Sequence, residues 1–390
     1  MDDILSIAET WSFWDRPVPE SVPRDVDLPP ALRDSLALVV VGVRRSGKST
    51  LMRQMIARYK LNPNHCVFLN FEDPRLAGAL DYPTLEALVE SFRKRHRRVR
   101  KLYFFLDEVQ WVSGWERWLR SQLDRPSGNH FILSGSNGQL LGGSELATSL
   151  TGRHWTCEVF PFSLPEAKRL VPAMTVERFL EDGGFPEPMQ IPEGDRLRRQ
   201  YFEDIVERDI RERIGARSAL PIRQVVQMVF ESAGSELSLR RLAAATGLAV
   251  ETVGGYLDAC EAAHLLFSCP FFAYSERKRA SMNRKYYPVD PGLRRIAVSP
   301  TGRDRGKALE CATYVALRRK YGQIYYWRGR GEVDFVFTRD GVVVPCQVTW
   351  EGPTARHERA LTDFYEAFPQ AAECLFVTRD DFESFAEELR

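Results

Sequence analysis

The sequence predicts an α/β fold whose first part is a parallel sheet with helices on both faces. Two observations support this prediction. The apolar run 36–41 leads into a glycine-containing loop and then into a helical pattern that begins at Leu51. Further apolar runs, separated by helical or polar stretches, come at 65–71, 102–106 and 130–133. Alternating strands and helices are typical of a sheet whose strands run parallel.

The loop between the first strand and its helix matches the pattern G-x4-G-K-S/T. In this pattern backbone N–H groups close around phosphates, and the helix N-terminus adds positive charge. Lys48 is expected to reach the β- and γ-phosphates of ATP, and the Ser49 hydroxyl to hold Mg²⁺. A chance glycine turn is the alternative, but the flanking strand and helix favour a phosphate site. The expected nucleotide-binding residues are Gly42, Arg44, Arg45, Ser46, Gly47, Lys48, Ser49 and Thr50.

Length and composition limit the remaining possibilities. A chain of 390 residues suggests two or three domains, and a formal net charge of +1 means that any nucleic-acid surface must be local. The seven cysteines are scattered along the chain, which suggests neither a zinc site nor a disulfide framework. The start of the chain does not resemble a signal peptide, and no stretch approaches a membrane helix. We therefore expect a cytoplasmic protein without a membrane partner.

The strand 102–106 ends in Asp107 and Glu108, which is the Walker B pattern. Asp107 is expected in the Mg²⁺ shell, and Glu108 is expected to orient and polarise the attacking water. Because parallel strands bring their carboxyl ends to one edge of the sheet, these acids should lie beside the phosphate loop. The fourth strand, 130–137, ends in small polar residues, where a γ-phosphate sensor is expected.

Three stretches of the first half have two interpretations each. The aromatic and proline-rich lead-in, 11–35, could pack beside an adenine or form a collar over the sheet edge. The basic run 93–101 could contact nucleic acid or form a solvated helix face. Trp111, Trp115 and Trp118 have near-helical spacing, which favours a packed helix face over base stacking.

Together with further motifs, these patterns give the chain a family resemblance. It resembles a group of prokaryotic AAA+-type ATPases that join a P-loop domain to a winged helix and a C-terminal PD-(D/E)XK nuclease-like domain. The P-loop is common to many NTPases, whereas the L-x-G-R, P-F-S and G-G-F-P-E motifs are more particular to this group. The resemblance covers nearly the whole chain after about residue 30. The matching stretches are 42–50, 104–110, 133–137, 150–153, 160–166, 183–187 and 206–210.

The resemblance implies further site residues. Asn137, or its neighbour Ser136, would be the sensor that positions the attacking water. Arg153 would be an arginine finger, offered to the next subunit, because a guanidinium can neutralise charge on the transferring phosphoryl group. A surface salt bridge is the alternative for Arg153, and Arg208 is the second candidate for the finger. The resemblance also implies self-association, with a ring hexamer as the arrangement that a finger acting in trans would suit.

The middle of the chain is predicted to be helical. Residues 166–215 resemble a lid or linker, and the helical patterns at 237–247 and 250–266 are typical of a helix-turn-helix. Strands around 267–274 and 285–288 would form a wing with a basic tip between them. This winged helix could contact DNA phosphates, or it could serve only for packing between subunits.

The end of the chain resembles the nuclease-like core, with Glu310 on a helix and Asp334 on a strand. Cleavage also needs an acid and a lysine two residues apart on the next strand, but here these positions are Gln347 and Thr349. Gln347 offers a carbonyl oxygen without charge, and Thr349 cannot replace an ammonium group. We therefore expect a degenerate module for DNA binding or assembly. The stretch 325–330 could contact nucleic acid or form a core strand.

These expectations combine into one functional prediction. The protein is expected to be a Mg²⁺-dependent ATPase that couples ATP binding and hydrolysis to DNA binding or remodelling as an oligomer. An ATP-gated switch or scaffold with slow turnover is the alternative, and an ATP-controlled nuclease is disfavoured by Gln347 and Thr349. The catalytic residues would be Lys48, Asp107, Glu108, Asn137 and Arg153, with Ser49 and Asp107 holding the metal. The expected domains are an ATPase domain (1–165), a lid or linker (166–219), a winged helix (220–300) and a nuclease-like domain (301–390).

Overall fold

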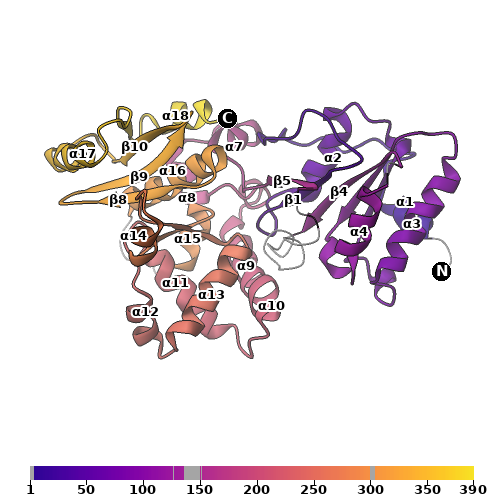
Figure 1. Ribbon diagram of the computed structural model, residues 1–390, viewed down its shortest axis with the longest axis horizontal. Coiled ribbons are helices and arrows are strands. Elements are labelled where there is room, and N and C mark those ends of the chain that lie inside the picture. Colours follow the sequence, from indigo (N-terminus) through magenta and orange to yellow (C-terminus); the bar gives the residue numbers. More distant parts are fainter. Residues whose placement is uncertain (1–3, 126, 136–149, 151, 299–303) are drawn as a thin grey trace. The chain divides into compact units, whose positions relative to one another are not determined.

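The computed structural model describes residues 4–125, 127–135, 150, 152–298 and 304–390 (Figure 1). The chain forms two compact units, Met1–Val159 and Phe160–Arg390. Each unit has its own sheet, and we describe each unit by itself.

The first unit contains a five-stranded sheet in which every strand runs parallel to its neighbours, in the order β2-β3-β4-β1-β5. This confirms the predicted α/β class. Parallel strands put all carboxyl ends at one edge, and β4 lies between β1, which leads into the P-loop, and β3, which carries the acids. The strands are β1 (Ala37–Val41), β2 (Cys66–Asn70), β3 (Leu102–Asp107), β4 (Asn129–Gly135) and β5 (His154–Glu158).

Helices cover both faces of this sheet. One apolar cluster joins the sheet to α1 (Ile4–Trp11), α3 (Tyr82–Arg95) and α4 (Trp115–Leu123), and the other joins it to α2 (Lys48–Arg58). Strand β1 is buried along its whole length, as its unbroken apolar run predicts for a strand covered on both sides. Short 3-10 turns complete the unit: η1 (Pro63–His65), η2 (Pro74–Leu76) and η3 (Val109–Trp111).

The lead-in covers the edge strand β2, which confirms the collar interpretation. The Ser12 hydroxyl accepts from the Phe68 N–H at 2.9 Å and so replaces a missing neighbour strand. The Trp14 indole N–H donates to the Cys66 carbonyl at 2.7 Å. Phe13 is buried and packs edge-on against Phe68. These contacts satisfy backbone groups that an open sheet edge would leave unpaired.

The tryptophan series is mainly a packed helix face, as its spacing predicts. Trp115 and Trp118 are buried on α4, and the Trp118 indole donates to Glu86 at 2.6 Å. Trp111 differs, because it lies before the helix and half of its surface is exposed.

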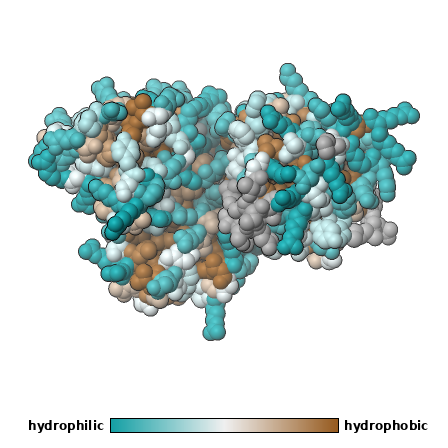
Figure 2. All heavy atoms as spheres, in the orientation of Figure 1, coloured by the Kyte–Doolittle hydropathy of each residue, from teal (hydrophilic) through white to brown (hydrophobic). Residues whose placement is uncertain are grey.

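The second unit begins with helices, as predicted for 166–215. They are α7 (Leu164–Leu170), α8 (Val176–Asp182), η4 (Pro188–Gln190), α9 (Gly194–Asp204), a π-helical turn η5 (Ile205–Arg211) and α10 (Glu212–Ile214). The next part contains α11 (Leu220–Glu231), α12 (Leu239–Thr246), α13 (Val250–Ala262), β6 (Leu266–Cys269), α14 (Glu276–Ser281), β7 (Lys285–Pro288) and α15 (Pro291–Ala297). On its visible face, hydrophobic residues gather over the helical part of this unit (Figure 2).

The stretch predicted to be a winged helix contains two successive helices, α12 and α13, and a pair of antiparallel strands. Helix α12 ends at Gly247 in the left-handed conformation, and β6 pairs with β7. The predicted basic stretch between the strands is present, with Arg277, Lys278 and Arg284 exposed, but two of its other cations have internal contacts. It folds into α14, where the Arg279 guanidinium lies over the Tyr325 ring, and Lys285 is fully buried beside Glu332. Aromatic and acidic neighbours therefore occupy part of the expected basic surface.

The C-terminal part is a four-stranded mixed sheet in the order β11-β10-β9-β8. Strands β8 and β9 and strands β9 and β10 pair antiparallel, whereas β10 and β11 pair parallel. Tyr326 and Trp327 on β8 are buried, which confirms the core-strand interpretation of that stretch. The elements are α16 (Arg305–Tyr321), β8 (Tyr325–Arg328), β9 (Glu332–Arg339), β10 (Val342–Val348), α17 (Ala355–Ala367), β11 (Leu375–Val377) and a final α18 (Phe382–Glu388).

The G-G-F-P-E motif has a structural cause. The Gly184 N–H donates to the buried Asp290 carboxylate at 2.5 Å, and the Leu293 N–H donates to its other oxygen at 2.7 Å. A Cβ on Gly183, whose φ is +72°, would come within 2.1 Å of Asp290 Oδ1. Only glycine leaves room for this carboxylate, so the motif joins α8 to the start of α15.

The buried Asp290 makes stability depend on pH in a direction opposite to most acids. Burial raises its pKa from 3.8 to about 6, so the folded protein binds more protons than the unfolded chain between pH 4 and 6. Stability contributed by this group is therefore present at low pH and is lost, by about 2 to 3 kcal/mol, as pH rises to 6. Asp290→Asn does not titrate, and its amide N–H₂ faces backbone donors. We expect the free energy of unfolding of the wild type, relative to this variant, to fall as pH rises from 4 to 6. Hydrogen exchange of amides in α15 measures this difference at each pH. A difference that stays constant with pH would contradict the raised pKa of Asp290.

Among the residues that the structure describes, no helix is both long enough and apolar enough to cross a membrane.

Candidate functional site

The loop after β1 has the backbone that a phosphate site requires. A Cβ on Gly42, at φ +145°, would lie 2.1 Å from the Val159 carbonyl oxygen, so a side chain would push β5's extension away from the loop. Gly47, at φ +99°, is the left-handed residue from which α2 starts. Glycine is needed at both places for different reasons, one steric and one conformational.

Lys48 lies at the first turn of α2 and is almost fully buried. Its ammonium group donates to the Gly42 carbonyl at 3.1 Å and to the Val43 carbonyl at 3.2 Å. The lysine is therefore folded across the loop that contains it. Phosphate oxygens are stronger acceptors than these carbonyls, so a bound phosphate would compete for this ammonium group.

Asp107, at the end of β3, connects strand β4 and the first turn of α2. Its carboxylate accepts from the Ser49 hydroxyl at 2.7 Å and, on the other oxygen, from the Ser134 hydroxyl at the end of β4. Burial, and then the charge of Glu108, raise the pKa of Asp107 above its usual value. The structure thus brings the P-loop serine and the first Walker B acid into direct contact, as the sequence predicts.

Glu108 follows Asp107 in a left-handed backbone conformation, with φ 55°. This conformation is uncommon for a non-glycine residue and turns the chain sharply at the end of β3. The Glu108 carboxylate accepts from the Gln110 side chain at 2.5 Å, and its own N–H points to the Ser134 hydroxyl at 3.3 Å. The second acid is therefore held in a fixed position beside the first.

Ser134 is a site residue that sequence reasoning missed. Its hydroxyl contacts Asp107 and the backbone N–H of Glu108, because β4 lies between β1 and β3. The sequence signal was the run of small polar residues at the end of this strand, but the expected sensors were the residues farther along. Asn137 and Ser136 lie outside the described residues, so their roles stay predictions.

We expect Ser134→Ala to lower ATP turnover by about 10-fold to 100-fold, because both Walker B acids lose a partner that orients them. Ser134 is a positioning residue, so its substitution should lower kcat and raise the Mg²⁺ concentration needed for the half-maximal rate. Steady-state phosphate release across a Mg²⁺ series measures both. Ser134→Thr keeps the hydroxyl and should recover part of the rate; equal rates for wild type and Ser134→Ala would contradict this assignment.

Arg24 is a second missed residue. It is buried, and its guanidinium donates to the Ser46 carbonyl in the P-loop at 2.7 Å. The Gln54 side chain on α2 donates to the Val22 carbonyl at 2.7 Å and accepts from the Arg24 N–H. The lead-in is therefore more than an edge cover, because it also supports the phosphate loop. The sequence interpretation of the lead-in depended on its aromatic and proline residues, and nothing in that pattern indicated a role for Arg24.

The other predicted nucleotide-binding residues of the P-loop have the following positions. Arg44 lies 3.9 Å from Glu72, and Arg45 has a left-handed backbone with φ 68°. Ser46 is fully buried, and within the described part of the chain its hydroxyl has no hydrogen-bond partner. Thr50 lies in the first turn of α2 and is half-buried.

Neither predicted arginine finger lies beside the P-loop of its own unit. Arg153 lies at the opposite edge of the first sheet, and Arg208 belongs to the second unit. Arg153 precedes β5, and its carbonyl accepts from the Ala37 N–H at the start of β1, so it lies at the amino edge, opposite the P-loop. There it pairs with Asp124, which confirms the salt-bridge interpretation for the single chain. Arg208 is exposed on η5 of the second unit. A role of either arginine toward another subunit stays a prediction.

The oxygen donors at the edge of the first sheet fit a magnesium ion. Mg²⁺ prefers hard oxygen ligands and usually takes few from the protein and the rest from water and phosphates. The Ser49 hydroxyl and the Asp107 carboxylate are such donors, and they lie in contact. These two residues would hold the ion.

The second unit contains a separate buried ionic cluster. Lys285 on β7 is fully buried and its ammonium group lies 2.6 Å from Glu332 on β9. Burial lowers its pKa, but the carboxylates of Glu310, Glu332 and Asp334 outweigh burial and leave the pKa raised. Burial, followed by the charge of Glu310, raises the pKa of Asp334 to about 7. No pattern in the sequence predicts that Lys285 lies beside these carboxylates.

Three carboxylates of this cluster, those of Glu310, Glu332 and Asp334, line a pocket of about 420 Å³. Glu310 accepts from the Tyr287 hydroxyl at 2.6 Å, and Asp334 accepts from the Val348 N–H at 2.8 Å. Gln347 is buried; its amide N–H donates to the Glu332 carbonyl, and its carbonyl oxygen has no partner among the described residues. Thr349 instead bonds to the Gly352 carbonyl at 3.0 Å. The rim carries Lys307, Arg328 and Arg356.

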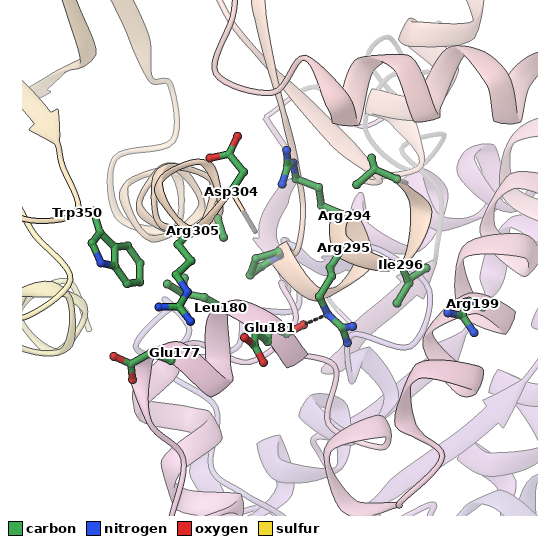
Figure 3. Close-up of a pocket in the computed structure, with 13 residues that line it drawn as sticks. Glu177, Leu180, Glu181, Arg199, Arg294, Arg295, Ile296, Asp304, Arg305 and Trp350 are labelled. Carbon is green, nitrogen blue, oxygen red and sulfur yellow. Dashed lines mark hydrogen bonds between the residues drawn. The ribbon is translucent and has the colours of Figure 1, made fainter. Parts of the chain in front are cut away.

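A second pocket of the same unit, of about 370 Å³, is lined by α8, α15, α16 and Trp350 (Figure 3). Three of its four arginines, Arg294, Arg295 and Arg305, have protein contacts. Arg295 donates to the Glu181 carbonyl at 2.7 Å, and the Arg294 guanidinium donates to the Phe230 carbonyl at 2.8 Å. Arg305 lies 5.8 Å from the Trp350 ring centre. These contacts join the helices, and we assign the pocket no ligand.

The fold and the P-loop site define the first unit as a P-loop nucleotide-binding domain. Comparison with protein families agrees: a model described as an AAA domain matches residues 34–168. Over these residues the chain is similar to AAA domains. Models of two domains of unknown function, DUF8612 and DUF4143, match residues 174–304 and 305–389.

Whole-chain similarities are more distant. An uncharacterized protein from Haemophilus influenzae is 28% identical over 340 residues, which cover 82% of this chain and 84% of that protein. Two variants of Thermotoga maritima RuvB have 15% sequence identity and a TM-score of 0.32. They cover 60% of this chain and 81% of their own. These relatives do not assign a function.

Proposed function

We propose that the protein is a Mg²⁺-dependent ATPase that couples ATP hydrolysis to the binding or remodelling of DNA. The observation that carries the ATPase proposal is the contact network at the edge of the first sheet. Lys48, Ser49, Asp107 and Glu108 converge there, with Ser134 linking the last two. This arrangement supports phosphoryl transfer, which depends mainly on positioning and charge stabilisation.

Each residue has a role that its position permits. Lys48 neutralises charge on the β- and γ-phosphates. Glu108 accepts a hydrogen bond from the attacking water and polarises it toward the γ-phosphate. Ser134 holds both acids in place. Ser49 and Asp107 would hold a magnesium ion, which when bound would supply positive charge to stabilise the transferring phosphoryl group.

The proposal that DNA is the partner rests on a local concentration of positive charge rather than on the net charge of the chain. The net charge of the chain is +1, yet seven of the nine residues from 93 to 101 are Lys or Arg. Helices α12 and α13 with strands β6 and β7 follow the order of a winged helix, which supports a nucleic-acid role as well as a packing role. Self-association is part of the proposal, because Arg153 at the amino edge could serve only another subunit's P-loop as a finger.

ATPase turnover with and without DNA tests this function. Purified full-length protein is assayed for phosphate release alone and with single-stranded, duplex and branched DNA, and its mass is measured in the same buffer. We expect turnover that rises at least about threefold with one DNA form, a change of about 0.7 kcal/mol in the barrier. A slow, flat response across all forms would favour the ATP-gated switch or scaffold and would exclude coupling to DNA.

The buried cluster of the second unit favours a second candidate function. Phosphodiester cleavage was disfavoured because Thr349 replaces the lysine of the expected strand, yet Lys285 brings an ammonium group to the same carboxylates. A metal-dependent nuclease activity at Glu310 and Asp334 therefore has a chemical basis. Incubation of supercoiled DNA with Mg²⁺ or Mn²⁺ tests it. Nicking that Asp334→Asn abolishes would support this function, and intact DNA at high protein concentration would exclude it.

A further inference from the structure

The basic run 93–101 begins in the last turn of α3 and ends just before β3, and its first residue holds it in place. The Arg93 guanidinium donates to Asn129 Oδ1 at 2.6 Å, to the Val99 carbonyl at 3.0 Å and to the Ser127 carbonyl at 2.7 Å. It also lies 3.3 Å from the Arg100 carbonyl oxygen. One internal arginine thus fastens the run to the loop before β4.

A close backbone approach strengthens this attachment. The Leu102 N–H donates to the Gly128 carbonyl at 3.0 Å, and a Cβ on Gly128 would lie 2.2 Å from the Arg100 carbonyl oxygen. The segment is therefore a packed part of the first unit rather than a loose tail. Side chains that it carries are presented from a fixed backbone, which lowers the entropy lost when they bind a ligand.

Five cations of this run point to solvent, and we call them the basic platform. All five are exposed, and within the described residues none of them makes an ion pair; they are Lys94, Arg97, Arg98, Arg100 and Lys101. The other two cations of the run have internal contacts, Arg93 as described and Arg95 over the Trp14 ring at 4.2 Å. Uncompensated like charges at this density repel one another, and an anionic partner would relieve that repulsion.

The platform lies away from the nucleotide site. It precedes β3, whose far end carries Asp107, so the two are separated by the length of a six-residue strand, about 20 Å. ATP at the P-loop therefore leaves the platform accessible. The platform also lies at the amino edge of the sheet, where Arg153 precedes β5.

We propose that the basic platform binds the phosphate backbone of duplex nucleic acid. Three of its five residues are arginines, whose planar guanidinium groups bind phosphate oxygens in pairs. Stable binding to an anionic membrane generally adds an apolar anchor to a basic patch, and among the described residues 94–101 no large apolar side chain is exposed. The inference rests on the proposed DNA partner and deepens it by naming the surface. It predicts contact without base readout.

Salt-dependent binding tests the proposal. The probe is a fluorescein-labelled DNA duplex, titrated with full-length protein without nucleotide at several KCl concentrations. The variant R97A/R98A/R100A/K101A should lower the slope of log affinity against log salt by about 3 to 4, since each lost phosphate contact removes about 0.9. At about 0.1 M salt the affinity should fall at least tenfold. Replacing the three arginines with lysine should retain most of the slope.

A matched control removes the same charge elsewhere. The variant R240A/R241A/R277A/R284A takes four exposed cations from the helix-turn-helix and wing of the second unit. A smaller loss than in the platform variant is expected; if the control loses the affinity and the platform variant keeps it, the proposal is overturned. Binding of the wild type to anionic vesicles but not to DNA also overturns it. If the protein binds DNA through the basic platform but does not hydrolyse ATP, the ATPase proposal is refuted and the platform proposal stands.

Discussion

Lys48→Ala should reduce ATP hydrolysis by at least about 100-fold, because its ammonium group is buried against the P-loop backbone, where it can neutralise charge on the transferring phosphate. The lysine ammonium already lies against the Gly42 and Val43 carbonyls, so its removal deletes the cation without an obvious need for the loop to unfold. Phosphate release by the full-length variant measures the rate, and fluorescence titration with a labelled ATP analogue measures binding. Both should weaken, since the lysine contacts phosphate in the ground state and in the transition state.

A matched control for this substitution is Lys60→Ala. Lys60 lies just after α2 and is exposed, so its loss removes one positive charge at a distance from the loop. Turnover by this variant should stay within about twofold of wild type, about 0.4 kcal/mol. Full activity of Lys48→Ala would contradict the assignment of the nucleotide site.

Lys285→Met should destabilise the second unit by about 3 to 5 kcal/mol. Methionine nearly fills the volume of the lysine stem but leaves Glu332, Asp334 and Glu310 without their buried cation. Hydrogen exchange of peptides from β7 and β9 in the full chain, followed in urea, measures this effect separately from the first unit. Local protection in β7 should fall most.

Two further variants define the cause of that loss. Arg330→Met breaks an ion pair with Asp363 in which the arginine is 81% exposed, and it should cost much less stability than Lys285→Met. The double variant Lys285→Met with Glu332→Gln removes the uncompensated charge and should recover part of the stability. Equal effects of Lys285→Met and Arg330→Met would show that the buried cluster has no special energetic role.

Much of the first unit could be predicted from sequence because its signals are local. The apolar run 36–41, the glycine loop and the acids after 102–106 each specify their own geometry, and parallel pairing then brings them together. Ser134 and Arg24 were missed for the opposite reason. A serine at a strand end and an arginine in an irregular segment have no local signature, and only strand order and packing place them beside the P-loop.

The second unit shows the same limit more strongly. Lys285 reads as part of a basic tip between two strands, but the intervening residues fold into α14 and β7 turns the lysine toward the carboxylates of β9 and α16. Gly183 and Gly184 read as a family motif, whereas their physical cause is a carboxylate more than a hundred residues later in the chain. Long-range contacts of this kind leave no periodic pattern in either partner.

Phosphate release by Glu108→Gln, measured beside ATP binding, tests the central claim most directly. The substitution keeps the size of the side chain and its hydrogen-bonding ability but removes the carboxylate that polarises water. If Glu108 acts as we propose, the variant will bind Mg²⁺ and ATP with an affinity within about threefold of wild type and will hydrolyse it at least about 100-fold more slowly. Hydrolysis at the wild-type rate by Glu108→Gln would contradict the account.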